Sequence, residues 1–269
     1  MSLRGKVVMI TGSTDGLGRE VARRVAALGA RVIVHGRNQE RGKAVVDEIT
    51  KDGKGSARFY AADLSSLAEV RTLAQAVLKN YDRLDVLVNN AGVLLRDRQV
   101  SRDGYEMHFA VNYLAGFLLT RTLLPTIVAS APSRIVNVAS VAQSPIDFSD
   151  VMLERPGRAG QGYGQSKFAQ VVFTIDLAEE LKGKSVTVTA LHPATMMDTS
   201  MVRAAGMQAR ATVNEGADAV MRQITGDVQS GQYYNGLQPA RPAAQASDDA
   251  TRVKLRQLSM QLTGLDQPR

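Results

Sequence analysis

A tyrosine and a lysine stand four residues apart in the segment Tyr163-Gly164-Gln165-Ser166-Lys167. On a helix, residues i and i+4 share a face, so the phenol and the ammonium group would project together. A free tyrosine has a pKa of about 10, too high for ready proton exchange at neutral pH. A nearby cation stabilises the phenolate and lowers this pKa, which makes a usable general acid/base. The spacing is common by chance, so it predicts chemistry only together with other motifs.

Three glycines lie in the segment TGSTDGLG (residues 11–18), between a strand-like run and a helical pattern. Glycines permit a tight turn and close approach of the backbone to a pyrophosphate, while the helix N-terminus supplies N–H donors. The spacing Gly-x3-Gly-x-Gly differs from the G-x-G-x-x-G dinucleotide fingerprint. A purely structural turn is therefore the alternative, but the position between strand and helix favours a dinucleotide site.

Arg37 lies 19 residues after Gly18, just beyond the second strand-like run. An acidic residue at about this place would bind the ribose 2′-OH of NAD, whereas an arginine accommodates the 2′-phosphate of NADP. No Asp or Glu occurs between residues 31 and 39. The sequence therefore favours NADP over NAD; a solvated surface arginine is the alternative.

Short β-branched runs alternate with longer helical patterns along the chain. This alternation predicts an α/β fold, a single Rossmann-type doubly wound parallel sheet with helices on both faces, in one domain spanning residues 1–269. The expected strands are 7–10, 32–34, 58–61, 86–88, 135–138 and 186–189, and the expected helices are about 17–28, 39–51, 66–80, 103–129 and 164–182.

Two stretches fall outside this rhythm, residues 141–162 and 193–213, and both follow strands. Open α/β sheets bind ligands at the carboxyl ends of their strands, so we expect both to be substrate loops. We also expect 193–213 to close over the cofactor. The tail, 235–269, is polar with a late helical pattern. The loops could form an adaptable apolar pocket, although core filling is the alternative; the residues concerned are Val141, Ile146, Phe148, Met152, Met196, Met197, Met201 and Met207.

Composition excludes several classes of protein. The chain has no cysteine and only three scattered histidines (His35, His108 and His192), so we expect no metal site and structural roles for the histidines. No apolar run approaches the ~20 residues needed to span a bilayer, and no signal-peptide pattern is present, so we expect a cytoplasmic protein without membrane attachment. Nucleic acid is not an expected partner, because no basic cluster is interleaved with aromatic residues.

The formal charge of +7 is unevenly distributed. Residues 1–60 hold 12 basic and 6 acidic side chains, whereas residues 61–202 hold 13 and 14. The surplus therefore lies in the segment expected to bind the adenosine and phosphate half of a dinucleotide. A positive field there would favour the more anionic NADP.

Five motifs occur in order: TGSTDGLG, Asn89-Asn90-Ala91-Gly92, Asn112 in FAVNYLAGF, Ser140 in IVNVAS, and YGQSK. As a set they resemble the short-chain dehydrogenase/reductase family over nearly the whole chain. The segments NYLAGFLLT and QGYGQSK, with GQYY at 231–234 and a tail ending LTGL, are similar to the retinol dehydrogenase and WW-domain oxidoreductase branch. One departure is His192-Pro193-Ala194-Thr195, where the family commonly has Pro-Gly after the sixth strand.

The resemblance implies a catalytic tetrad of Asn112, Ser140, Tyr163 and Lys167. In this scheme Tyr163 exchanges a proton with the substrate oxygen, Ser140 stabilises that oxygen, Lys167 lowers the Tyr163 pKa and holds the nicotinamide ribose, and Asn112 anchors a water chain. Asp63 could instead cap a helix, and Asn90 could instead be a turn residue. The implied cofactor contacts are Gly12, Ser13, Asp15, Gly16, Leu17, Arg37, Asp63, Leu64, Asn90, Ala91, Gly92, Tyr163, Lys167 and Thr195.

The function expected from these features is hydride transfer between NADP(H) and the carbonyl or alcohol group of a fairly apolar small molecule. The resemblance also implies a homodimer or homotetramer built on the helices around 103–129 and 164–182. The alternative is an NADP-binding sensor or scaffold without turnover. A complete tetrad argues against the alternative, because a sensor has no need of Tyr163 beside Lys167.

Overall fold

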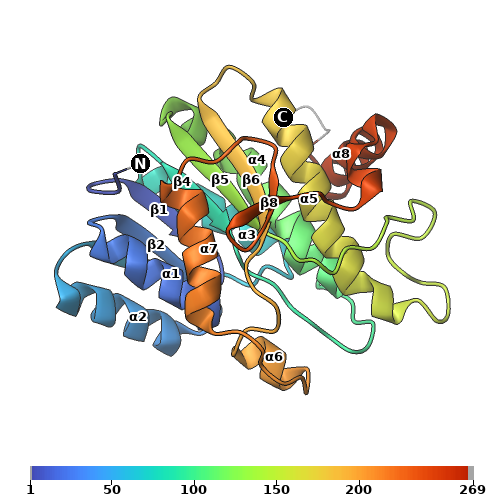
Figure 1. Ribbon diagram of the computed structural model, residues 1–269, viewed down its shortest axis with the longest axis horizontal. Coiled ribbons are helices and arrows are strands. Elements are labelled where there is room, and N and C mark those ends of the chain that lie inside the picture. The colour runs from blue at the N-terminus through green and yellow to red at the C-terminus, as the bar shows by residue number, and fades with distance from the viewer. Residues whose placement is uncertain (1, 266–269) are drawn as a thin grey trace.

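A computed structural model describes residues 2–265. Its centre is an eight-stranded sheet of order β3-β2-β1-β4-β5-β6-β7-β8, parallel except for β8 (Figure 1). The first six strands cover those expected from the β-branched runs, and the fold class is confirmed. The strands are β1 (Val7–Ile10), β2 (Arg31–Gly36), β3 (Ser56–Ala61), β4 (Val86–Asn89), β5 (Ser133–Val138), β6 (Val186–His192), β7 (Tyr233–Asn235) and β8 (Gln238–Ala240).

Helices cover both faces of the sheet. Successive residues of a strand point to opposite faces, so Val8 and Ile10 pack in one apolar cluster and Val7 and Met9 in the other. The first cluster is covered by α1 (Gly16–Ala27), α2 (Gln39–Asp52) and α7 (Val213–Thr225). The second is covered by α3 (Leu67–Asn80), α4 (Ala115–Ala129), α5 (Gly162–Glu180) and α8 (Asp249–Leu262).

The strand order reverses beside β1, and this reversal creates the binding crevice. From β1 the chain proceeds outward through β2 and β3, then returns to place β4 on the other side of β1. The glycine-rich turn (residues 11–18) follows β1 and the segment 90–95 follows β4, so the two loops leave adjacent strands at the same edge. Ligands of doubly wound sheets bind at such a switch point.

The structure differs from the sequence expectation at several elements. The helix expected from residue 103 begins at residue 107, and the stretch Phe109–Leu114 is a π-helix, η1, that continues into α4. The short α6 (Ser200–Ala204), α7, β7 and β8 were not expected. The strands β7 and β8 have three residues each, too few to show the alternation of apolar and polar residues that predicts a strand.

The C-terminal segment packs on the body of the protein. Arg256 on α8 donates a 3.0 Å hydrogen bond to Asp176 on α5, and the hydroxyls of Tyr113 and Ser259 are 2.7 Å apart. Figure 1 shows α8 beside α5. The expected polar tail therefore contains β8 and the helix α8, which packs on α5. Residues 266–269 of the tail lie outside the described residues.

Within residues 2–265, one helix is long and apolar enough to cross a membrane, the continuous stretch Phe109–Ala129. It packs against the sheet and α3, and 56% of its most apolar window is buried inside the protein. Its apolar character is that of a core helix.

Candidate active site

The glycine-rich turn packs tightly against the loop after β4. Gly12 has a φ of 64°, and a Cβ there would lie 2.9 Å from the Cα of Ala91. A side chain at this position would force the two loops apart. The turn ends at Asp15, the N-cap of α1, and the N–H groups of Leu17 and Gly18 then have no acceptor within residues 2–265. These first-turn donors can receive an anion at the helix N-terminus.

Buried and half-buried side chains hold the turn in place. The Gly12 N–H donates to Nδ1 of His35 (3.1 Å), and the Asn90 side chain donates to the carbonyl oxygens of Thr11 (2.9 Å) and Gly12 (3.2 Å). The Ser13 hydroxyl donates to the Ile10 carbonyl (2.7 Å) and accepts from the His35 N–H (3.0 Å). The side chains of Asn90 and Ser13 thus fix the conformation of the turn. For Asn90 this is the structural role that was the alternative to a cofactor contact.

His35 is neutral in this arrangement. Its Nδ1 accepts from an N–H, and its Nε2 lies 3.2 Å from the Ala62 carbonyl, so the single proton sits on Nε2. Burial lowers the pKa of His35 to about 4, which keeps the ring neutral at physiological pH.

Arg37 is exposed immediately after β2, beside the turn. Within the described residues it has no ion pair and no side-chain hydrogen bond. Asp63, expected as an adenine contact, accepts the Ser65 N–H (3.0 Å) and so caps the start of the next turn. Burial raises the pKa of Asp63, but hydrogen bonds from Ser65 and the charges of Arg37 and Arg102 outweigh it, so the net shift is downward. Leu64 is buried in the core.

Tyr163 and Lys167 lie on the first turns of α5 and face the end of β5. Nζ of Lys167 donates to the Val138 carbonyl (2.7 Å) and to Oε1 of Gln170 (3.0 Å), and lies 5.7 Å from the centre of the Tyr163 ring. Burial lowers the pKa of Lys167 to about 7. Burial raises the pKa of Tyr163 above its usual value, and the hydrogen bond with the Ser140 side chain offsets only part of this rise, so the lowering expected from Lys167 is not seen in this structure. Ser140 therefore lies within hydrogen-bonding reach of the proposed acid/base.

Asn112 joins the π-helix to the loop after β4. Its Oδ1 accepts the Val93 N–H (2.7 Å), and its Nδ2 donates to the Val93 carbonyl (3.1 Å) and to the Ser166 hydroxyl (2.9 Å). A Cβ on Gly92 would lie 3.2 Å from the Asn112 Oδ1 and 3.6 Å from the Lys167 Nζ. All four tetrad residues thus border the same crevice, and π-helical turns often occur at functional sites.

The segment 193–213 lies over the glycine-rich turn. A Cβ on Gly16 would lie 3.2 Å from the Thr199 side chain, and the Ser200 hydroxyl donates to Asp15 (2.6 Å). Arg96, from the loop after β4, donates to the Ala205 carbonyl (2.9 Å). The segment therefore contacts both loops at the switch point.

Local geometry explains the missing glycine in this segment. The left-handed conformation falls on Met196, with a φ of 50°, and not on Ala194. Thr195 Oγ1 lies 3.0 Å from Nε2 of His192 at the end of β6. His192 is therefore a strand-end residue, and the turn beside it is built without Pro-Gly.

The apolar residues of the two loops divide between core and surface. Ile146 is buried and Met197 packs against the α1–α7 cluster, as in the core-filling alternative. Val141 is 50% exposed, and Met201 and Met207 are partly buried. The residues available to a substrate are thus fewer than the sequence alone suggested.

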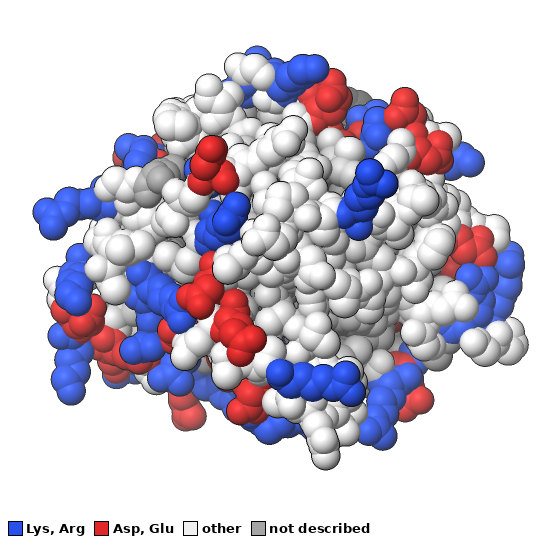
Figure 2. All heavy atoms as spheres, in the orientation of Figure 1, with Lys and Arg blue, Asp and Glu red and all other residues white. Residues whose placement is uncertain are grey.

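Several arginines in residues 1–60 are held in ion pairs with nearby carboxylates. Arg19 and Arg23 both pair with Glu48 (2.9 and 2.5 Å), and Arg24 pairs with Asp218 (2.5 Å). Figure 2 shows basic and acidic side chains interspersed over the region where Figure 1 places α1 and α2. The electrostatic support for a phosphorylated dinucleotide therefore rests on Arg37 more than on the segment as a whole.

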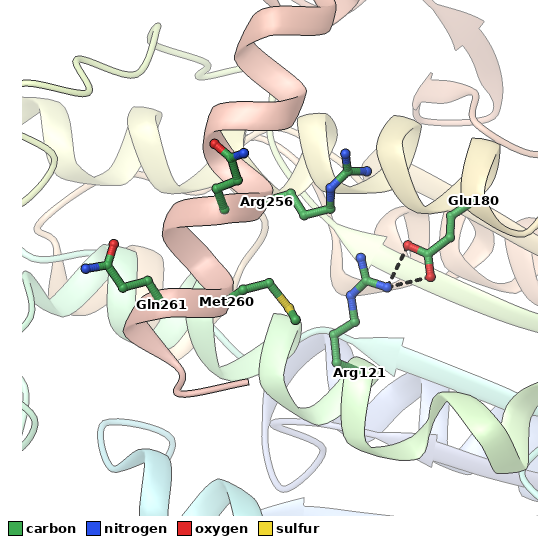
Figure 3. A pocket seen from close by; sticks show the side chains of 6 residues that line it. Arg121, Glu180, Arg256, Met260 and Gln261 are labelled. Carbon is green, nitrogen blue, oxygen red and sulfur yellow. Dashed lines mark hydrogen bonds and ion pairs between the residues drawn. The ribbon is translucent and has the colours of Figure 1, made fainter. Parts of the chain in front are cut away.

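A separate groove of about 690 Å³ lies between α4, α5 and α8. Arg121 pairs with Glu180 on one side, and Met260 and Gln261 of α8 form the other (Figure 3). Glu180 is at the far end of α5 from Tyr163, and a helix rises about 1.5 Å per residue, so Glu180 is roughly 25 Å from Tyr163 along the helix. The groove is not part of the candidate active site.

Sequence reasoning missed several residues around the site. His35 was expected only as a structural residue, and Arg41, Ser200, Glu106 and His108 were not expected to contact it. Their contacts join segments far apart in the chain, so no local pattern signals them. The available signal was that Glu106 and His108 are ionisable residues close to the apolar run that follows them.

Comparisons with known proteins agree with this geometry. A family model described as short chain dehydrogenase matches residues 6–210. Human retinol dehydrogenase 11 is 36% identical over 279 residues, which cover 98% of this chain and 88% of that protein. Human retinol dehydrogenase 13 is 34% identical over 292 residues, which cover 99% and 87%.

Solved structures give the same result. An uncharacterised protein from Mycobacterium paratuberculosis superposes with a TM-score of 0.83 at 28% identity, covering 98% of this chain and 95% of that chain. A short chain dehydrogenase from Shigella flexneri complexed with NADP has a TM-score of 0.69 at 28% identity, covering 88% and 99%. The chain belongs to the short-chain dehydrogenase family and is an oxidoreductase of that family. Within the family it resembles the retinol dehydrogenases.

Proposed function

We propose that this protein is an NADP(H)-dependent oxidoreductase that interconverts a carbonyl and an alcohol on a fairly apolar small molecule. The observation that carries the proposal is the convergence of Tyr163, Lys167 and Ser140 beside Gly92, on the edge of the crevice opposite the glycine-rich turn. A dinucleotide lying across the switch point would have its pyrophosphate at the turn and its nicotinamide at the tetrad.

The chain offers suitable groups for such a cofactor. The free N–H groups of Leu17 and Gly18 suit a pyrophosphate, and Gly12 lets the backbone approach it. Arg37 is exposed and forms no ion pair within residues 2–265, although its charge acts on Asp63, so it suits a 2′-phosphate. The NADP bound to the Shigella flexneri protein and to a metagenomic short-chain oxidoreductase supports the same cofactor here.

The protein's own groups would handle the proton. When bound, NADPH supplies the hydride for reduction. The Tyr163 hydroxyl would donate a proton to the carbonyl oxygen, and the Ser140 hydroxyl would hydrogen-bond the same oxygen as negative charge develops on it. In its protonated form, Lys167 is held by Val138 and Gln170 near the phenol, and its charge would favour the phenolate left behind.

Asn112 has a positioning role in this scheme. Its side chain is fully engaged by Val93 and Ser166, so it fixes the loop that carries Gly92 relative to α5. The water chain that the resemblance implies for Asn112 stays a proposal.

The similarity to proteins named retinol dehydrogenases favours a bulky apolar alcohol or aldehyde as substrate. Val141, Met201 and Met207 remain accessible enough to contact such a molecule. We further propose one domain over residues 1–269 with substrate loops 141–162 and 193–213, a cytoplasmic location, and a homodimer or homotetramer.

A screen of NADPH oxidation over ketones, aldehydes (retinal included) and quinones, repeated with NADH, tests the proposal. We expect turnover with NADPH that is lost in Tyr163→Phe, while the dissociation constant for NADPH changes little. Unchanged turnover in Tyr163→Phe would refute the mechanism. Tight NADPH binding with no turnover on any substrate would support the alternative, a sensor or scaffold.

A further inference from the structure

Glu106 and His108 form a buried ionisable pair that the proposed mechanism does not use. Each side chain is 1% exposed, and the His108 Nδ1 lies 2.7 Å from the Glu106 Oε1. The second carboxylate oxygen accepts the N–H of Phe109 (2.8 Å), the first residue of the π-helix that carries Asn112. Burial raises the pKa of Glu106, but these hydrogen bonds outweigh it, so the pKa is lowered and the carboxylate stays ionised.

The hydrogen bonds define the tautomer of His108. The Leu95 N–H can only donate, and it points to Nε2 of His108 at 3.0 Å. Nε2 therefore carries no proton, and the ring proton lies on Nδ1, where it is donated to Glu106. His108 is thus neutral, with both nitrogens engaged.

The pair lies directly against the catalytic tyrosine. The rings of His108 and Tyr163 meet edge to face, with centres 6.1 Å apart and planes at 83°. A Cβ on Gly162 would lie 2.7 Å from the His108 Nδ1 and 2.8 Å from the Glu106 Oε1. The helix that carries Tyr163 can therefore begin against the pair only because residue 162 is glycine.

The pair also reaches the cofactor side of the crevice. Leu95, which donates to His108, belongs to the loop that contains Asn90, Ala91 and Gly92. Glu106 and His108 thus contact three segments of the site: the loop after β4, the π-helix and the first turn of α5. These segments carry Gly92, Asn112 and Tyr163.

We propose that Glu106 and His108 are positioning residues, which set the orientation of the Tyr163 ring relative to Gly92 and Asn112. The proposal rests on the oxidoreductase function above. A misplacement of about 1 Å can cost about 100-fold in rate, so a buried pair that joins three parts of a site has enough leverage to control turnover. Its effect would fall on kcat, because both side chains are buried and so are shielded from a substrate or cofactor.

Glu106→Gln and His108→Asn test this inference, since each keeps much of the side-chain volume. Asparagine places an N–H₂ near the Nδ1 position and so keeps the bond to Glu106, but loses the acceptor for Leu95. Ser130→Ala is the matched control, because it removes a buried hydrogen bond from the Leu84 N–H (2.9 Å) in a part of the fold remote from the site. Melting temperature, kcat, KM and the NADPH dissociation constant are measured for all three.

In both test variants we expect kcat to fall about tenfold or more, with NADPH affinity within about threefold of wild type. The primary isotope effect with 4-deuterated NADPH should also rise as the chemical step becomes limiting. Ser130→Ala should lose stability without these changes. A kcat within twofold of wild type in Glu106→Gln would overturn the proposal.

A measurement without turnover separates this inference from the proposed function. With [13Cζ]tyrosine label, assigned by comparison with Tyr163→Phe, the Tyr163 resonance should shift in Glu106→Gln and stay in place in Ser130→Ala. An unmoved resonance would refute the positioning role even if the wild-type protein proved inactive. A shifted resonance in an inactive protein would retain the geometric role and reject the oxidoreductase function.

Discussion

The Ser200 hydroxyl donates a 2.6 Å hydrogen bond to Asp15, which joins the segment 193–213 to the N-cap of α1. The same carboxylate group accepts the Gly16 N–H (2.7 Å) and lies 3.5 Å from Arg41. The hydrogen bond from Ser200 is the largest cause of the lowered pKa of Asp15, and the Gly16 N–H and the charge of Arg41 add to it, while burial opposes them. The contact holds the segment over the glycine-rich turn, where the pyrophosphate is proposed to bind.

Removing this contact should loosen the segment. A hydrogen bond to a charged group contributes about 1.5–3 kcal/mol, and less where it is exposed, so Ser200→Ala should increase the open population several-fold. We expect faster limited proteolysis within 193–213 and partial protection by NADPH. Thr50→Ala, which removes an exposed hydrogen bond on α2, is the control and should leave the cleavage rate unchanged. Equal rates in wild type and Ser200→Ala would show that other contacts hold the segment.

The sequence predicted those features that local patterns encode. Most of the first six strands are apolar runs such as VVMI and VIV that are buried on both faces, and the glycine-rich turn and YGQSK are each recognisable within a few residues. The strand order of the doubly wound sheet then brings the carboxyl ends of β1 and β4 together, so that the loops after them meet.

The rest depends on contacts between distant residues. His35 supports Gly12 from the neighbouring strand, and Ser200 reaches Asp15 across 185 positions. The spacing of apolar residues does not reveal the π-helix at Phe109–Leu114, because the π-helix replaces only one turn of an otherwise regular helix. Such features depend on packing between distant segments, which local sequence patterns do not predict.

Arg37→Leu should weaken the binding of NADPH and spare NADH. A charged hydrogen bond contributes about 1.5–3 kcal/mol, so we expect KM for NADPH to rise roughly 10- to 100-fold with little change for NADH. Lys51→Ala removes an equal charge near the end of α2 and is the control for the long-range electrostatic effect of losing one positive charge. A similar change for both cofactors in Arg37→Leu would reject its selective role.

Acid should destabilise the glycine-rich turn through His35. The folded protein holds this ring neutral with a pKa of about 4, whereas in the unfolded chain the pKa is about 6.5, so the unfolded state binds more protons between these values. The free energy of unfolding should therefore fall by up to roughly 3 kcal/mol as pH drops from 6.5 to 4.

His35→Asn isolates this contribution, because the amide oxygen can take the place of Nδ1 and accept the Gly12 N–H without titrating. Urea denaturation at several pH values should give a shallower acid slope for the variant than for wild type. Identical slopes would show that His35 does not contribute to the acid sensitivity.

Lys167→Met should remove turnover and raise stability together. Burial lowers the pKa of Lys167 to about 7. Below this pH the folded protein contains a buried charge, which costs free energy. Between pH 7 and about 10.5 the lysine is protonated in the unfolded chain and releases its proton on folding. The unfolded chain binds the additional proton in that window, so wild-type stability should rise with pH there. The variant should lack this rise and melt at a higher temperature at pH 7, by about 2–4 °C for each kcal/mol recovered.

A buried lysine that lowers stability in this way is an example of a stability–activity trade-off at the active site. If Lys167→Met instead melts lower than wild type, the bonds to Val138 and Gln170 outweigh the cost of burial, and the lysine is a net structural support.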